Sequence, residues 1–236
     1  MSYLKDLQGT MTSAKRKNAK KDFFAFYVGR PMSYVLTIPF LYLKTMPNTI
    51  SVISTIEVVI AAIVLSTATS PAMGAIGMLL FFLWNLLDGV DGNIARLKKI
   101  SSPMGSVYDA MSGYAAMFLF FFSSGIYAFH ITNDSWGFVQ IIIGAISGMA
   151  QLFPRLVMHK AKSEMNNANG ANSLSDKGSY GFVKILGLNL TSISGMVQPL
   201  LLIAIFTNTT VLFNLVYCII NVMLMLITLF KILHNE

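Results

Sequence analysis

The sequence predicts an all-α integral membrane protein, with six transmembrane helices preceded by an interfacial amphipathic helix. Of its 236 residues, 55% are hydrophobic and only 11% are charged. That charge content is less than half of what an ordinary soluble domain carries. The mean hydropathy is +0.64. Several apolar runs approach or exceed the ~20 residues that a helix needs to cross a bilayer. The runs are continuous and do not alternate, which excludes a barrel.

Six apolar runs are long enough to be spans, at residues 48–68, 72–98, 102–129, 135–160, 180–206 and 210–232. Residues 31–46 are apolar but short, and two prolines interrupt them. We expect this stretch to lie along the membrane surface before the first span; a true crossing there would make seven spans. The chain then divides into a basic N-terminal segment (1–30), the interfacial helix (31–46) and the transmembrane domain (47–236).

Basic residues are distributed on one side of this arrangement. The predicted loops 69–71, 130–134 and 207–209 contain no Lys or Arg, whereas the opposite loops and the N-terminal segment are rich in them. The positive-inside rule then places both termini, and the end of the second span, in the cytoplasm. A polar run rich in Asn, Gly and Ser, residues 163–179, predicts a cytoplasmic linker. The compact architecture favours a prokaryotic plasma membrane.

The net charge of +7 does not indicate nucleic-acid binding. Its residues form a collar that faces anionic lipid headgroups, each worth about 1 kcal/mol. No aromatic stacking platform accompanies the charge, so membrane lipid is the expected partner and nucleic acid is not.

Three carboxylates are the main candidates for chemistry. Asp88 and Asp91 are three residues apart and share one helix face, and Asp109 lies on the next span across a short connection. Because consecutive spans are antiparallel neighbours, we expect the three to converge near the cytoplasmic surface. A bare carboxylate near hydrocarbon costs about 2.5–3.5 kcal/mol. Oxygen-only ligands favour Mg²⁺ or Mn²⁺, so the cluster predicts one or two such ions.

A simpler interpretation stays open for the same residues. The carboxylates could sit at a wet helix end and pair with Arg96, Lys98 and Lys99. Small residues beside the carboxylates, Gly89, Gly92 and Ala95, would let a ligand or another helix approach the backbone in either case.

The ordered spacing favours a ligand site. Seven positions follow one another as Asp88-x2-Asp91-Gly92-x2-Ala95-Arg96-x8-Gly105-x3-Asp109. This pattern resembles the signature of the CDP-alcohol phosphotransferase (CDP-alcohol phosphatidyltransferase) family. Pro47-Asn48 at the start of the first span is similar to the family's Pro-Asn entry. The resemblance covers roughly residues 30–233 and also includes the six-span architecture with cytoplasmic termini.

The resemblance implies a membrane transferase of phospholipid biosynthesis. Such an enzyme moves a phospho-alcohol or phosphatidyl group from a CDP-linked donor to an acceptor alcohol and releases CMP. It also implies a homodimer. The metal ligands would be Asp88, Asp91 and Asp109. The CDP-binding residues would be Asp88, Asp91, Gly92, Ala95, Arg96, Gly105 and Asn48.

One position departs from the family pattern. The signature ends with a fourth Asp, the proposed base for the attacking hydroxyl, but this chain has Gly113 one turn after Asp109. Losing a general base typically costs about 10²–10⁴-fold in rate. The base could then be another carboxylate, a metal-bound water or the acceptor itself. The catalytic candidates are Asp109 and Glu57, which is the only carboxylate deep within a predicted span. Two alternatives are an acceptor that needs no base and a non-catalytic homologue that binds a CDP-alcohol.

Basic residues on later spans are candidates for the acceptor. Arg155 lies one turn inside the end of the fourth span, and Lys184 lies near the start of the fifth. Either could bind the phosphate of a polyol-phosphate acceptor, or reach the headgroup layer instead. His159 is more typical of an interfacial polar residue than of a catalyst. A transporter or channel is a third class of function, but charge clustered at one face without inverted halves argues against it.

Overall fold

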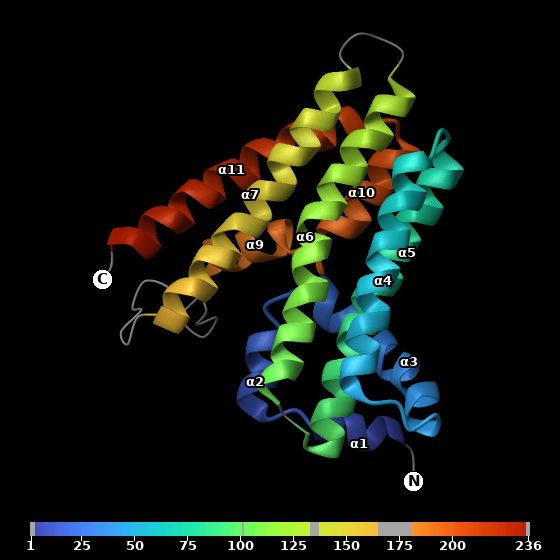
Figure 1. Cartoon of the computed structure of the whole chain (residues 1–236), viewed down its shortest axis with the longest axis vertical. Coiled ribbons are helices and arrows are strands. Elements are labelled where there is room, and N and C mark those ends of the chain that lie inside the picture. The colour runs from blue at the N-terminus through green and yellow to red at the C-terminus, as the bar shows by residue number, and fades with distance from the viewer. Residues whose placement is uncertain (1–2, 101, 133–136, 165–180, 235–236) are drawn as a thin grey trace.

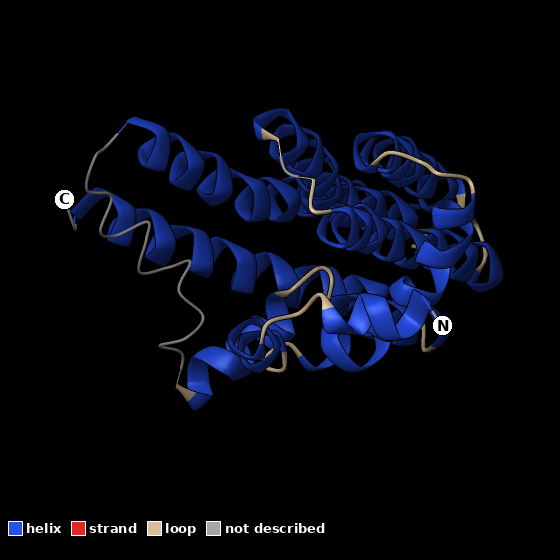
Figure 2. Cartoon of the chain, turned by 90° about the horizontal axis from the view of Figure 1, so that it is seen from below, coloured by secondary structure: helices blue, strands red, loops and turns tan. Residues whose placement is uncertain are grey.

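The computed structural model describes residues 3–100, 102–132, 137–164 and 181–234. Within these ranges the fold is helical and contains no strand, as Figure 2 shows (helices blue). The all-α class predicted from the sequence is therefore confirmed. The predicted linker at 163–179 lies outside the described residues except at its first two positions, which end a helix.

Over the described residues, the chain begins with four short helical elements and continues with seven helices, five of which are long (Figure 1). The short elements before residue 43 are α1 (Tyr3–Gly9), α2 (Ser13–Ala19), the π-helix η1 (Ala25–Gly29) and α3 (Arg30–Tyr42). The elements that follow are α4 (Pro47–Thr67), α5 (Pro71–Lys98), α6 (Pro103–Ile131), α7 (Gly137–Glu164), α9 (Phe182–Thr191), α10 (Val197–Phe206) and α11 (Thr210–His234).

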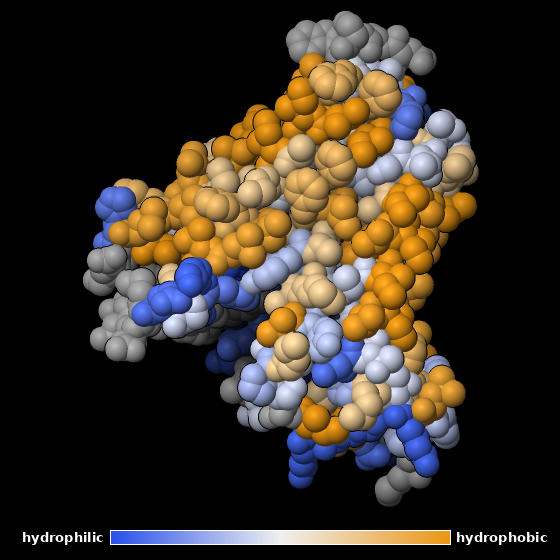
Figure 3. Space-filling view, viewed as in Figure 1, coloured by the Kyte–Doolittle hydropathy of each residue, from blue (hydrophilic) through white to orange (hydrophobic). Residues whose placement is uncertain are grey.

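Five helices, α4, α5, α6, α7 and α11, are long and apolar enough to cross a membrane. Figure 3 shows hydrophobic residues over the upper and middle parts of the visible face, and hydrophilic residues at the lower end and at the left, where α7 and α11 end in Figure 1. The N-terminal helices lie at this same lower end in Figure 1. These features support an integral membrane protein. We call the lower end, where α5 ends at Lys98 and α6 begins at Pro103, the basic end.

The predicted fifth span differs from the structure. Residues 182–206 form not one helix but two of ten residues each, α9 and α10, separated by Ser192–Met196. The carbonyl groups freed at the end of α9 accept hydrogen bonds from other helices. Tyr217 Oη donates to Leu190 O at 2.8 Å, and Gln151 Nε2 donates to Thr191 O at 3.4 Å. Non-helical backbone at membrane depth requires such partners. The sixth crossing stays a prediction, in which α9 and α10 would together form the fifth span.

The core lies between α4, α5, α6, α10 and α11. Helix α4 packs against both α5 and α6. Large buried rings fill the contact, and Phe81 of α5 meets Phe120 of α6 edge to face, with ring centroids 5.1 Å apart. Towards the basic end, α3 packs on the same helices around buried Ile50, Val90 and Ile94. This packing holds the N-terminal helices against the end of α5.

Helices α6 and α7 approach each other very closely through glycines. A Cβ added at Gly144 of α7 would lie 2.5 Å from the backbone oxygen of Phe121, and one added at Gly125 of α6 would lie 2.4 Å from Gln140 O. Small residues at such contacts let helix backbones pack tightly inside a membrane. Backbone atoms cannot move aside as the end of a side chain can.

We therefore expect Gly144→Ala to destabilise the protein by about 1–3 kcal/mol, the usual cost of overpacking. The measurement is the thermal unfolding midpoint of the protein in detergent. Gly187→Ala in α9 is the matched control, because an added Cβ there meets nothing within 4 Å. Equal midpoints for the two variants would contradict the close helix contact.

Candidate functional site

A cavity of about 280 Å³ opens near the basic end of the bundle. Its walls come from η1, α3, α5, α6 and the segment between α9 and α10. The lining residues are Ala25, Gly29, Arg30, Ser33, Asn85, Asp88, Gly89, Asp91, Gly92, Asn93, Arg96, Asp109 and Ser194. Polar and charged side chains therefore predominate, in a molecule that is otherwise mainly apolar.

Helix α5 provides most of this lining. Six of its lining residues recur at helical spacing over three turns and form one polar stripe on the helix: Asn85, Asp88, Gly89, Gly92, Asn93 and Arg96. The glycines matter because α3 lies close by: a Cβ at Gly89 would be 3.0 Å from Ser33 Oγ. Larger side chains would fill the space between α5 and the N-terminal helices.

The three predicted carboxylates all line the cavity, but in different surroundings. Asp91 is only 4% exposed, and its Oδ2 accepts a hydrogen bond from Ser51 of α4 at 2.5 Å. Asp88 has a buried Oδ1 that has no hydrogen-bond partner among the described residues. Asp109 is exposed towards the cavity. Asp88 is within electrostatic range of the other two. The three side chains thus line one cavity, and their convergence on a single ion stays a prediction.

A hydroxyl lies next to this cluster. Ser112 of α6 accepts a hydrogen bond from Trp84 Nε1 of α5 at 2.8 Å, and its Oγ is 2.9 Å from Ser54 Oγ of α4. It also interacts with the Asp88 side chain. One buried serine therefore joins the three helices that carry or support the carboxylates.

Arg96 is held over the cavity by a polar chain that begins on α3. Its Nη2 donates to Asn93 Oδ1 at 2.8 Å. The amide nitrogen of Asn93 donates to Thr37 Oγ1 at 3.0 Å and to Ser33 Oγ at 3.3 Å. The guanidinium packs over Gly92, where an added Cβ would be 3.0 Å from Nη1. Asn93 and Gly92 therefore fix the direction in which Arg96 points.

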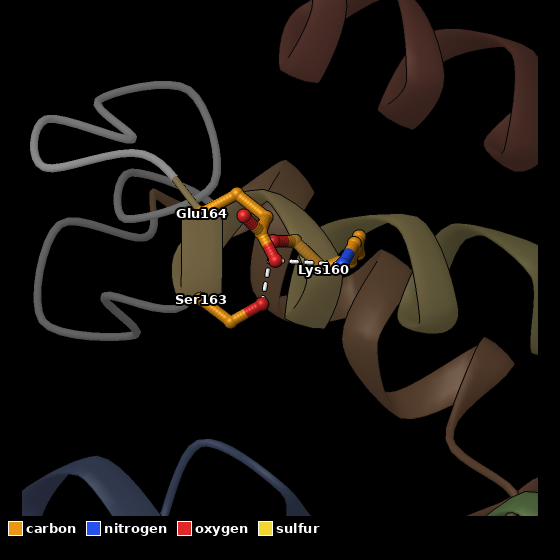
Figure 4. Close-up of polar contacts among 3 residues, drawn as sticks. All are labelled: Lys160, Ser163 and Glu164. Atoms are coloured by element: carbon orange, nitrogen blue, oxygen red, sulfur yellow. Dashed lines mark hydrogen bonds and ion pairs between the residues drawn. The ribbon is translucent and has the colours of Figure 1, made fainter.

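Simple ion pairing does not explain the carboxylates. Among the described residues, one ion pair is closer than 4 Å: Lys160 Nζ lies 2.6 Å from Glu164 Oε1 on the last turn of α7 (Figure 4). Ser163 Oγ on the same turn donates a hydrogen bond to Lys160 O. That pair is exposed and apart from the cavity lining. Lys98 donates to Thr45 O instead of to an Asp. Among the described residues no ion pair within 4 Å joins a carboxylate of the cluster to Arg96, Lys98 or Lys99, although Arg96 is within electrostatic range of Asp91 and Asp109.

The carboxylate oxygens that line the cavity are of the kind that bind a hard divalent cation. The buried, unpartnered Asp88 Oδ1 is an atom that such a cation would satisfy. Within the described ranges, however, no group of three or more His, Cys, Asp or Glu side chains is gathered closely enough to hold an ion. The residues present therefore fit such an ion by type, and the identity of the ion stays a prediction.

Comparison with known proteins identifies the family. The family model described as CDP-alcohol phosphatidyltransferase matches residues 44–230, which is most of the chain and includes all three carboxylates. The chain belongs to the CDP-alcohol phosphatidyltransferase family. No curated protein matches the chain as a relative. Family membership implies a transferase that moves a phosphatidyl group from a CDP-linked alcohol to an acceptor alcohol, generally with a divalent metal.

Some residues that the CDP-alcohol phosphatidyltransferase signature assigns to the donor lie beside the cavity rather than in its lining. Asn48 and Gly105 are neighbours, since an added Cβ at Gly105 would be 3.4 Å from Asn48 Oδ1. Neither they nor Ala95 lines the cavity, whereas Gly92 and Arg96 do. Contacts of Asn48, Gly105 and Ala95 with the CDP-linked donor therefore stay predictions.

Glu57, Arg155 and Lys184 also lie outside the lining. Both carboxylate oxygens of Glu57 are buried in α4 without a hydrogen-bond partner among the described residues. Arg155 is exposed on α7, within electrostatic range of Tyr114 and His159, which are hydrogen-bonded to each other. The roles of the three as base and as acceptor-phosphate ligands therefore stay predictions.

Gly113 faces open space. A Cβ added there meets nothing within 4 Å, so the position where the sequence resemblance predicts an acid has room for a side chain in this protein. Crowding of α6 therefore does not account for the glycine.

Sequence reasoning missed the part of the site that comes from the break between α9 and α10. Ser194 lines the cavity, and its carbonyl oxygen accepts a hydrogen bond from Asn85 Nδ2 at 3.1 Å. Ser192 donates to Asp22 Oδ2 at 3.0 Å. The predicted continuous helix over this stretch concealed these contacts. The available signal was the run Ser-Ile-Ser-Gly at 192–195, which is a poor helix former.

Proposed function

We propose that this protein transfers a phospho-alcohol or phosphatidyl group from a CDP-linked donor to an acceptor alcohol or polyol phosphate, with a divalent metal, and releases CMP. The observation that carries the proposal is the cavity itself. Asp88, Asp91 and Asp109 meet there from two helices inside the region matched by the family model, and Arg96 faces them. Family membership alone gives the class of reaction, and the cavity supports the proposed location of that reaction.

The carboxylates would hold one or two Mg²⁺ or Mn²⁺ ions, which would neutralise the donor diphosphate and the leaving phosphate. Arg96 would bind the diphosphate from the open side of the cavity, as a planar guanidinium suits phosphate oxygens. Gly92 leaves room for this approach because it has no side chain. Asn48, Ala95 and Gly105 would contact the nucleotide, as the family signature suggests.

The reaction forms a bond between the acceptor oxygen and the phosphorus distal to cytidine. The bond from that phosphorus to the bridging oxygen breaks, and CMP leaves with the electron pair. The acceptor hydroxyl gives up its proton. We assign that proton to the carboxylate of Asp109, which is exposed towards the cavity. Glu57 is a weaker candidate because it does not line the cavity.

Arg155 and Lys184 would bind the phosphate of the acceptor if the acceptor is a polyol phosphate. The positive-inside distribution supports a cytoplasmic active site and cytoplasmic termini. The assignment to a prokaryotic plasma membrane rests on the compact architecture alone. A homodimer follows from the family resemblance alone.

The test is CMP release by membranes that contain the protein, supplied with Mg²⁺ or Mn²⁺ and a panel of CDP-diacylglycerol and CDP-polyols. We expect release that requires one donor of the panel and stops when EDTA is added. Asp88→Ala in the same membranes is the inactive control. Metal-dependent CDP binding without release from any donor would support a non-catalytic homologue instead, and neither binding nor release would overturn the proposal.

A further inference from the structure

Arg30 is a second guanidinium in the cavity, and it lies before the region that the family model matches. It sits where η1 ends and α3 begins. Its Nη1 donates to the sulfur of Met11 at 3.4 Å, and its Nε is buried without a hydrogen-bond partner. Thioether sulfur is a weak acceptor. No ion pair within 4 Å includes Arg30 among the described residues.

The guanidinium group of Arg30 therefore lacks hydrogen-bond acceptors for some of its donors. A buried donor without a partner is destabilising, and more so when it is charged. Arg30 is also within electrostatic range of Arg96, so two like charges face the same space. Three carboxylates line the same cavity, and the proposed divalent ions would neutralise them. An anionic ligand would then accept from Arg30 and offset the repulsion between the two guanidinium groups.

The segment that carries Arg30 is fixed in place from both sides. Before it, Asn189 of α9 accepts from Phe23 N at 2.7 Å and donates to Lys21 O at 2.6 Å. Buried Asp22 accepts from Ser192 in the α9–α10 break. After it, Ser33 receives the amide hydrogen bond from Asn93. The position of Arg30 is therefore set by contacts with the transmembrane domain.

We propose that Arg30 binds the diphosphate of the CDP-linked donor together with Arg96, so that the N-terminal segment is part of the donor site. This inference rests on the proposed function and adds a residue to it. Both arginines face a cavity that the donor diphosphate would enter to meet the carboxylates. Arg155 and Lys184, the candidates for an acceptor phosphate, lie outside the lining.

The experiment measures the affinity of the full-length protein for CDP and for cytidine by calorimetry, in nanodiscs with Mg²⁺. Arg30→Gln is expected to weaken CDP binding about 10–100-fold, the worth of a charge-assisted hydrogen bond, and to leave cytidine binding unchanged. The CDP affinity of Arg30→Lys should lie between those of wild type and Arg30→Gln, because lysine keeps the charge but lacks the fork of donors of a guanidinium group. Arg16→Gln is the matched control, an exposed arginine of the same segment.

The same variants are assayed for turnover. A raised KM for the donor with an unchanged KM for the acceptor is expected for Arg30→Gln. A change in acceptor KM alone would assign the arginine to the acceptor and overturn the inference. Unchanged CDP affinity with weaker binding to phosphatidylglycerol vesicles would assign it to lipid headgroups and also overturn it. If wild-type protein itself binds no CDP, the proposed function fails; if wild type binds and Arg30→Gln binds equally, only this inference fails.

Discussion

Asp88→Asn is expected to abolish CMP release and at the same time to make the metal-free protein more stable. The side chain keeps its shape but loses its charge. Residues that merely support a metal ligand change metal affinity about 10–100-fold when removed. We therefore expect loss of a proposed direct ligand to lower turnover by about 10³-fold or more. CMP release with the preferred donor at saturating Mg²⁺ measures this effect.

The gain in stability follows from the surroundings of Asp88. Its Oδ1 is buried without a partner, and Asp91 and Asp109 lie within electrostatic range. Replacing a carboxylate that has one buried, unpartnered oxygen with a neutral amide removes this repulsion, and we expect a gain of about 1–3 kcal/mol in EDTA. The unfolding midpoint in detergent measures it, and Asp6→Asn is the control because Asp6 is an exposed side chain on α1. Lower stability together with lost activity would indicate a structural role for Asp88 instead.

Much of the site could be predicted because several of its residues recur at helical spacing along one short stretch of the sequence. Asp88, Asp91 and Arg96 lie within three turns of α5, so their common location follows from the periodicity of a helix. Asp109 could be added because a short connection makes the next helix antiparallel. Asn85 and Asn93 belong to the same stripe, and the same reasoning would have found them.

The rest of the site depends on contacts between distant parts of the chain. Asp22 meets Ser192 across 170 residues, and Phe23 meets Asn189 across 166. No periodicity in the sequence relates such positions. Hydropathy also hid the break between α9 and α10, because the residues around it are apolar enough to read as one continuous span. The break is stabilised by side chains such as Tyr217 and Gln151, whose partners only the fold reveals.

Gly113→Asp is expected to raise turnover about 10-fold or more. The position lies one turn after Asp109 on α6, and an added Cβ meets nothing within 4 Å, so the new carboxylate has room beside the cluster. In the wild-type protein, Asp109 would have to help hold a cation and also take the proton of the acceptor. A second carboxylate would separate these roles, and a positioned general base typically contributes about 10²–10⁴-fold.

Gly113→Asn is the decisive control for this gain. Asparagine has nearly the same shape as aspartate and the same effect on the helix, but its amide cannot take a proton at neutral pH. An increase with Asp and none with Asn would show that proton removal limits the wild-type enzyme. Equal rates for wild type and both variants would mean that the acceptor loses its proton without a base at this position. A protein that uses an acidic or already ionised acceptor would behave in that way, and the identity of the acceptor would then explain why glycine suffices on α6.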